Sequence, residues 1–307
     1  MRIAELDGLR GIAILTVLAV HSYLGIVGGW LGIDLFFVLS GYLITSALMR
    51  DASLVRFYRR RLGRILPPLI ATIAMAYAIA PGFRVEPAAY FYANFVPPES
   101  LGSLGHTWYL SIEEQFYLAW PLAFLFFRRG LTLAIVVCVA WGFHAWMAAS
   151  GADLETIHRS TFSRMDAIAV GCALALLRPT VGRGTGWAAF ALVVASAFVA
   201  RPEPLTIAVG LMLFPIVCAG LIAASPQIPV LGSPILVYCG ERAWGLYLYH
   251  YPIFCALEPF QDPHRKAEWI GLAIAKVALS LSIAEVSYRT IERWRMNPQA
   301  LRRRLAQ

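Results

Sequence analysis

The chain has 307 residues, of which 59% are hydrophobic and only 14% charged, and its mean hydropathy is +0.65. Soluble domains carry about a quarter charged residues, so this composition excludes an ordinary soluble protein and predicts one that crosses a membrane several times. The net charge of +8 does not indicate a nucleic acid partner, because the basic residues cluster at the ends of apolar segments. The five cysteines lie in apolar stretches without CxxC spacing, so we expect them to be packing residues.

Ten apolar segments are candidates for transmembrane helices, which require roughly 20 residues, although the seventh is short. The first is too long for a signal peptide and carries no visible cleavage site, so we expect it to remain as a span. The predicted spans are 8–27, 31–49, 65–82, 107–127, 131–149, 162–178, 186–200, 205–224, 235–257 and 268–288. Because no linker is long enough to separate two domains, we predict a single all-α transmembrane bundle over residues 1–307.

Basic residues between the spans predict the orientation of the bundle. With the N-terminus in the cytoplasm, seventeen Lys and Arg residues fall on the cytoplasmic side and five on the far side. Since cytoplasmic loops carry the excess of basic residues, both termini are predicted to be cytoplasmic. No internal repeat pairs two halves of the chain, which disfavours inverted-repeat transporter folds.

The first span, within LDGLRGIAILTVLAVHSYLG, contains Arg10 and His21. At about 100° per residue, eleven residues of helix turn through three turns plus about 20°, so both side chains share one face, about 16 Å apart along the axis. Ionisable groups at membrane depth cost at least ~2.5 kcal/mol and usually face the interior of a bundle or a water-filled cavity. We therefore expect this face to avoid lipid, with Arg10 near the cytoplasm and His21 past the midplane.

The second span begins with Asp34, in WLGIDLFFVLSGYLIT, after a short Gly-rich turn. A carboxylate in the first turn of a helix is favoured by the helix dipole alone. The short turn also makes the first two spans antiparallel neighbours, so Asp34 could instead approach His21. Both interpretations remain open from the residues.

A run of arginines, RFYRRRLGRILPPL, follows on the predicted cytoplasmic side. Arg56, Arg59, Arg60 and Arg64 share one broad helical face that ends at Pro67 and Pro68. Such a run can anchor the topology on anionic headgroups, at about 1 kcal/mol per residue. Alternatively it can bind phosphate, because guanidinium groups bind phosphate oxygens in a bidentate manner.

The fourth span enters through HTWYLSIEEQFYLAWPL, which holds His106, Ser111, Glu113 and Glu114. The aromatic residues, Trp108 among them, fit an interfacial belt, but the acid pair does not. Adjacent carboxylates on a helix point about 100° apart, so at most one of them readily faces a shared cavity. We expect Glu113 to have a role in the site.

Two later spans add further ionisable residues. Arg164 and Asp166 open the sixth span two residues apart, so each is expected to pair with another helix rather than with its neighbour. His250 lies in the ninth span, in LYLYHYPIF, where a lone histidine is usually a hydrogen-bonded packing residue.

Several catalytic motifs are missing from the sequence. It contains no GxSxG, HExxH or GxxxxGK[ST] and no clustered Cys/His set, so neither a serine-elbow esterase nor a metal or nucleotide-hydrolysis site is indicated. The residues alone leave proton-coupled transport and catalysis open.

Seven segments together resemble the acyltransferase-3 family of integral membrane acyltransferases. They run in order from residue 6 to residue 294: LDGLRGIAILTVLAVH, GGWLGIDLFFVLSGYLIT, FYRRRLGRILP, HTWYLSIEEQFYLAWP, FSRMDAIAVGCALA, LYLYHYPIF and IERW. The resemblance implies transfer of an acyl group, commonly acetyl from acetyl-CoA, to hydroxyls of carbohydrates or natural products. Some members carry an added SGNH-type hydrolase domain; we expect the stand-alone transmembrane form, in a bacterial cytoplasmic (inner) membrane.

The resemblance also implies roles for individual residues. The family's Arg-x10-His signature matches Arg10 and His21, and His21 is the natural general base, with Asp34 or Glu113 to orient it. Acyl-CoA is cytoplasmic and carries phosphates, so we expect donor binding by Arg10, Arg56, Arg59, Arg60 and Arg64. The supporting or acceptor-side residues are Ser40, His106, Trp108, Ser111, Arg164, Asp166 and His250.

The expected partners are acyl-CoA as co-substrate, a carbohydrate, glycolipid or natural-product acceptor, and membrane lipid, with no metal. Transfer directly to the acceptor and transfer through an acyl-enzyme both fit the sequence. The competing hypothesis is a proton-coupled transporter or exporter of a lipid-linked sugar or small molecule, with His21 and Glu113 as relay groups.

Overall fold

The computed structural model describes residues 3–22, 26–258 and 266–292, and those residues form helices and connecting loops without a strand. The all-α prediction is therefore confirmed. The longer helices are α1 (Ala4–His21), α2 (Gly32–Arg50), α3 (Leu54–Ile79), α5 (Trp108–Phe126), α6 (Arg129–Ala149), α8 (Thr161–Leu177), α9 (Arg183–Val199), α10 (Leu211–Ala224), α12 (Ala243–Leu257) and α13 (Lys266–Ser287). The shorter ones are η1 (Gly29–Leu31), α4 (Glu86–Ala89), η2 (Ala93–Phe95), η3 (Pro98–Thr107), α7 (Leu154–Arg159), η4 (Thr206–Gly210), η5 (Ser225–Gln227), η6 (Pro229–Gly232), α11 (Pro234–Glu241) and η8 (Tyr288–Glu292).

Each of the ten predicted segments overlaps a helix or a pair of consecutive helices. Within the described part, five helical stretches are long and apolar enough to cross a membrane by length and composition: Gly29–Arg50, Leu54–Ile79, Arg129–Ala149, Thr206–Gln227 and Glu268–Glu292. The other predicted segments form helices that are shorter or more polar. For example, α1 contains Glu5, Asp7 and Arg10, and α5 contains the Glu113–Glu114 pair.

Three predicted boundaries are wrong. Helix α1 ends at His21 rather than at residue 27, with Ser22 as its C-cap, so His21 lies at the end of the helix. Helix α3 starts at Leu54 rather than at residue 65, so the arginine run belongs to the same helix as the third predicted segment. The ninth segment breaks at Arg242, whose backbone leaves helical geometry at φ −103° and ψ 3°, and this divides α11 from α12.

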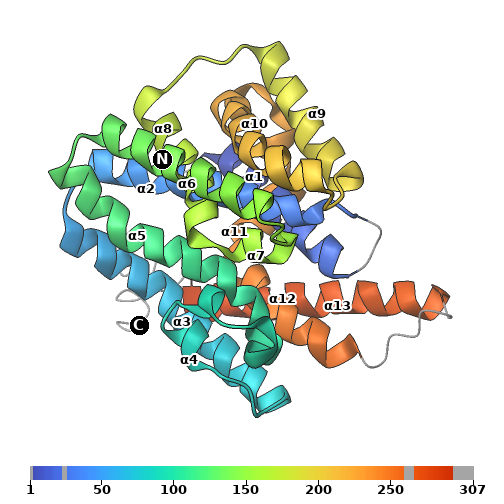
Figure 1. Ribbon diagram of the computed structural model, residues 1–307. Coiled ribbons are helices and arrows are strands. Elements are labelled where there is room, and N and C mark those ends of the chain that lie inside the picture. The colour runs from blue at the N-terminus through green and yellow to red at the C-terminus, as the bar shows by residue number, and fades with distance from the viewer. Residues whose placement is uncertain (1–2, 23–25, 259–265, 293–307) are drawn as a thin grey trace, which may run out of the picture.

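Small residues allow close packing in the centre of the bundle. A Cβ atom on Gly41 of α2 would lie 1.9 Å from the carbonyl oxygen of Ile168, and one on Gly171 of α8 would lie 2.0 Å from that of Val38. Helices α2 and α8 therefore contact each other backbone to backbone, as small residues permit in membrane bundles. Helix α1 packs against α2, α11 and α12, and α12 lies beside α13 (Figure 1). This arrangement places the Arg10–His21 face inside the bundle.

Candidate active site

A cavity of about 1130 Å³ opens among α1, α2, α3, α5, α12 and η8. Small-molecule sites usually measure about 300–1,000 Å³, so this cavity has room for a large ligand. One wall is cationic, and its arginines come from α1 and α3: Arg10, Arg56, Arg59, Arg60, Arg61 and Arg64. All five arginines predicted to bind the donor therefore line one space.

The arginines of this wall differ in how far carboxylates neutralise them. Arg10 Nη1 lies 2.9 Å from Asp7 Oδ1, and Arg56 Nη2 lies 3.0 Å from Asp51 Oδ1. Among the described residues, no ion pair within 4 Å joins Arg59 or Arg64 to a carboxylate. The wall can therefore hold an anionic ligand, and guanidinium groups suit phosphate.

Arg61 is the residue of this wall that the sequence prediction missed. Its side chain is 14% exposed, pairs with Glu114, and places Nη2 3.4 Å from Glu113 Oε2. Its Cζ lies 3.4 Å from the centre of the Tyr117 ring. Helical spacing could have predicted its place, because Arg61 is four residues after Phe57 and three before Arg64, and residues at these spacings share one helix face. Both Phe57 and Arg64 line the cavity.

The two adjacent carboxylates separate as the 100° spacing predicts. Glu113 lines the cavity and accepts a hydrogen bond from the Ser40 hydroxyl of α2, whereas Glu114 is held by Arg61 and is not part of the lining. Ser111 does not line the cavity. Its hydroxyl donates to the Thr107 carbonyl (3.1 Å) and accepts from the Ala93 amide (3.0 Å), so this residue holds the loop before α5.

Three histidines come together from distant parts of the chain. The ring of His250 lies 5.3 Å from that of His21 and 5.4 Å from that of His106, measured between centroids, and Tyr251 lies 5.2 Å from His21. Nδ1 of His250 contacts the carbonyls of Leu246 (3.0 Å) and Tyr247 (2.7 Å). Because a carbonyl only accepts, Nδ1 carries the proton and Nε2 is left with a lone pair. The structure therefore places His106 and His250, predicted as supporting residues, beside His21.

No group of His, Cys, Asp and Glu side chains within the described residues is arranged to hold a metal ion.

Two tyrosines lie between the cavity and the histidines. Tyr109 and Tyr247 both line the cavity, and their ring centroids are 5.2 Å apart. The Tyr247 ring also lies 5.2 Å from His106 and 6.0 Å from His250. The inner end of the cavity is thus next to the histidine cluster.

Asp34 pairs with a different residue from the one that the sequence suggested, His21. Asp34 is fully buried and forms its ion pair with Arg164 of α8, and Nε2 of His158 lies 3.9 Å away. A buried guanidinium is a stronger partner than a neutral imidazole, because it carries a permanent charge. Asp34 is therefore a helix-joining residue rather than the orienting group of His21.

The remaining predicted residues of this region also join helices. Asp166 accepts a hydrogen bond from Nε1 of Trp141 on α6 at 3.1 Å. Arg164 and Asp166 thus each find a partner on another helix, as their two-residue spacing predicted. Trp108 packs its ring 5.0 Å from that of His158, outside the cavity lining.

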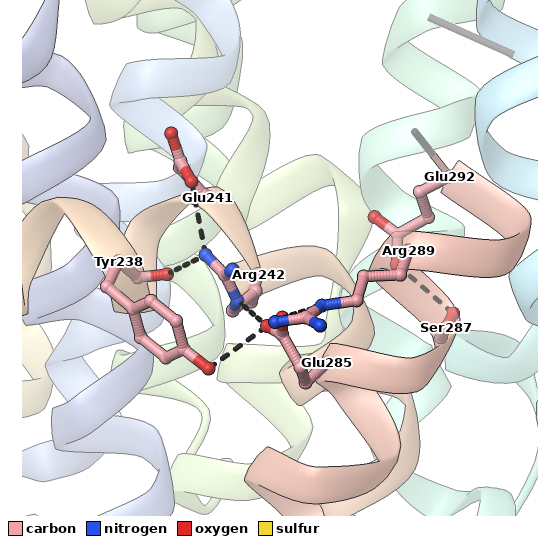
Figure 2. Close-up of polar contacts among 7 residues, drawn as sticks. All are labelled: Tyr238, Glu241, Arg242, Glu285, Ser287, Arg289 and Glu292. Carbon is pink, nitrogen blue, oxygen red and sulfur yellow. Dashed lines mark hydrogen bonds and ion pairs between the residues drawn. The ribbon is translucent and has the colours of Figure 1, made fainter. Parts of the chain in front are cut away.

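The break between α11 and α12 is tied to the end of α13. Figure 2 shows Arg242 between two carboxylates, with Nη1 3.1 Å from Glu241 and Nε paired with Glu285. The Tyr238 hydroxyl donates to the same Glu285 at 3.0 Å (Figure 2). Glu241 and Glu292 also line the cavity, so this network holds part of its wall.

Comparison with known proteins gives one family and several curated relatives. The model of an acyltransferase domain family, acyltransferase 3, matches residues 3–286. The peptidoglycan O-acetyltransferase OatA of Listeria monocytogenes is 31% identical over 94% of this chain and 55% of its own length. The putative peptidoglycan O-acetyltransferase YrhL of Bacillus subtilis is 29% identical over 95% of this chain and 54% of its own length. The O-acetyltransferase OatA of Staphylococcus aureus is 28% identical over 94% of this chain and 56% of its own length. The chain thus spans about half the length of these relatives. No solved structure matches it significantly.

Proposed function

The chain belongs to the acyltransferase-3 family, and on this premise we propose that it is a membrane O-acyltransferase that moves an acetyl group from acetyl-CoA to a hydroxyl group of a carbohydrate. The resemblance noted in the sequence is confirmed by the family match, which covers nearly the whole chain. The relatives' names specify O-acetyl transfer, and in two cases peptidoglycan as its object. For this chain we propose a cell-envelope carbohydrate of that kind as the acceptor.

The observation that carries the proposal is one cavity with a cationic wall at one end and histidines just beyond the other. CoA carries a pyrophosphate and a 3′-phosphate at one end and the thioester at the other. Arg59 and Arg64 suit the phosphates, since they make no ion pair within the described residues. The pantetheine arm would then extend towards Tyr247 and bring the thioester carbonyl to the part of the cavity that lies next to the histidine cluster.

His21 is proposed as the general base. As the acceptor oxygen attacks the thioester carbonyl, an imidazole nitrogen of His21 takes the hydroxyl proton, a contribution of about 10²–10⁴-fold. The C–S bond then breaks, the ester remains on the acceptor, and the imidazolium returns the proton to the CoA thiolate. His106 and His250 lie next to His21 and bound the space in which this occurs.

Glu113 is proposed to act at the cavity rather than on His21. Its recorded partners are the Ser40 hydroxyl and Arg61, so it fixes the α2–α3–α5 corner that faces the donor. Arg10, 24% exposed and held by Asp7, is proposed to contact the donor from α1.

We also propose the ten-span topology with both termini in the cytoplasm of a bacterial cell. The excess of basic residues on one side supports this orientation. It places the arginine-lined cavity on the cytoplasmic side, where acyl-CoA is available.

The test is transfer of labelled acetyl by the purified protein to a peptidoglycan-derived oligosaccharide. We expect label in a base-labile ester of the acceptor and release of an equal amount of CoA. S-acetyl-pantetheine is the matched donor, because it keeps the thioester and lacks the phosphates; it should require a much higher concentration for half-maximal rate. An intact thioester, with protons or sugar moved across a vesicle membrane instead, would establish the transporter hypothesis.

A further inference from the structure

Two aromatic rings close the inner end of the cavity. Tyr109 of α5 and Tyr247 of α12 meet edge to face, with centroids 5.2 Å apart and planes at 67°. Each is 4% exposed although it lines the cavity. Tyr247 of this pair is also in contact with the histidine cluster, so the pair is the part of the lining that separates the cavity from the histidines.

Both rings are fixed by their surroundings. The Tyr247 hydroxyl donates a hydrogen bond to the backbone carbonyl of His106. The Tyr109 ring packs 4.7 Å from Phe37 and 6.1 Å from Phe36, both of α2. A ring that is anchored by a hydrogen bond or by packing on other rings yields little to an oversized ligand, because buried groups are close-packed.

The geometry points to a role for this pair that rests on the proposed function: Tyr109 and Tyr247 set the length of the acyl group that is transferred. With the donor phosphates at the arginine wall, the acyl end of the donor faces these two rings. The histidines follow immediately, since Tyr247 lies 5.2 Å from His106. An acetyl group ends at the rings, whereas each further methylene overlaps with them.

The size of the effect follows from the cost of one methylene in a tight apolar site. Such a methylene changes kcat/KM by about 10–200-fold. Butyryl-CoA carries two more methylenes than acetyl-CoA, so its kcat/KM should be lower by at least about 100-fold. Replacing either tyrosine by leucine removes the outer part of a ring and should reduce this discrimination by at least about 10-fold.

The experiment measures kcat/KM of the purified full chain for acetyl-, propionyl- and butyryl-CoA, in wild type, Tyr109→Leu and Tyr247→Leu. The matched control is Tyr249→Leu, because Tyr249 is an equally buried tyrosine of α12 that bonds to Ser287 at 3.1 Å and does not line the cavity. Its butyryl-to-acetyl ratio should equal that of wild type. Tyr247→Phe, which keeps the ring, should also stay selective.

Two results would overturn the inference: wild type that transfers butyryl as fast as acetyl, or an unchanged ratio in both leucine variants. If neither variant folds, the inference is tested on wild type alone, by measuring its inhibition by thioether analogues of the three acyl-CoA donors. Inhibition should weaken with chain length, and equal inhibition would contradict a length limit. Absence of any acetyl transfer by wild type would refute the proposed function and this inference with it, whereas acetyl transfer without length selectivity would refute this inference alone.

Discussion

Replacing Arg61 with methionine tests whether this buried cation holds α3 to α5. The side chain is 14% exposed and serves two carboxylates, Glu113 and Glu114, which are 6% and 9% exposed. Methionine keeps an unbranched apolar chain but leaves both acids without their cation.

The magnitude follows from the burial of the pair. Removing one partner of a buried ion pair costs about 3–5 kcal/mol, because the remaining charge is uncompensated. At roughly 2–4 °C per kcal/mol, a cost of about 3 kcal/mol lowers Tm by roughly 6–12 °C. Arg56→Met is the matched control on the same helix, because the Arg56–Asp51 pair is 65% and 26% exposed. An exposed pair contributes no more than about 1 kcal/mol.

The assay is thermal unfolding of the detergent-purified variants, with the double variant Arg61→Met/Glu114→Gln included. Removing the main orphaned acid should restore part of the lost Tm, so the two changes should not be additive. The reasoning would be refuted if Arg61→Met melted within about 2 °C of Arg56→Met, or if the double variant melted lower than the single one.

Three further expectations follow from the cavity walls. Arg64→Ala should raise KM for acetyl-CoA about 10-fold and leave kcat nearly unchanged, because a phosphate contact is made equally in ground and transition states; an unchanged KM would reduce the arginine run to a topology anchor. Glu113→Gln should lower kcat more than Glu114→Gln, and Glu114→Gln should lower Tm more; the reverse order in folded protein would remove Glu113 from the site. Glu285→Gln should lower Tm and raise KM, since Arg242 loses its carboxylate; wild-type values in both assays would show that this network does not hold the wall.

Much of the helical architecture could be predicted, because the length of an apolar run sets the length of a helix. The details that failed depend on single residues and on the surrounding fold. Helix α1 stops at His21 although apolar residues follow, and the ninth segment breaks where Arg242 turns to meet Glu285. The arginine run and the third predicted segment form one helix, α3, which continues through Pro67 and Pro68, and nothing in the sequence pattern separates prolines that end a helix from prolines within one.

The candidate site was predicted in its components but not in its pairings. His21, His106 and His250 were each selected, yet only the fold shows that they meet. For Asp34 the sequence left open a helix-start carboxylate and a partner of His21, whereas its partner in the structure is Arg164 on α8. Contacts between distant segments depend on how the helices pack, and a single sequence does not encode that in a local pattern.

Substitution of His21 gives the most direct test of the central claim, that a donor bound at the arginine wall is attacked with His21 as base. Binding and turnover of acetyl-CoA are measured together for wild type, His21→Gln and the control His144→Gln, a buried histidine whose Nε2 lies 2.7 Å from the Ile207 carbonyl. The account predicts that His21→Gln binds acetyl-CoA with an unchanged Kd and transfers acetyl at least ~100-fold more slowly, while His144→Gln matches wild type. Near-normal transfer by His21→Gln would contradict the account.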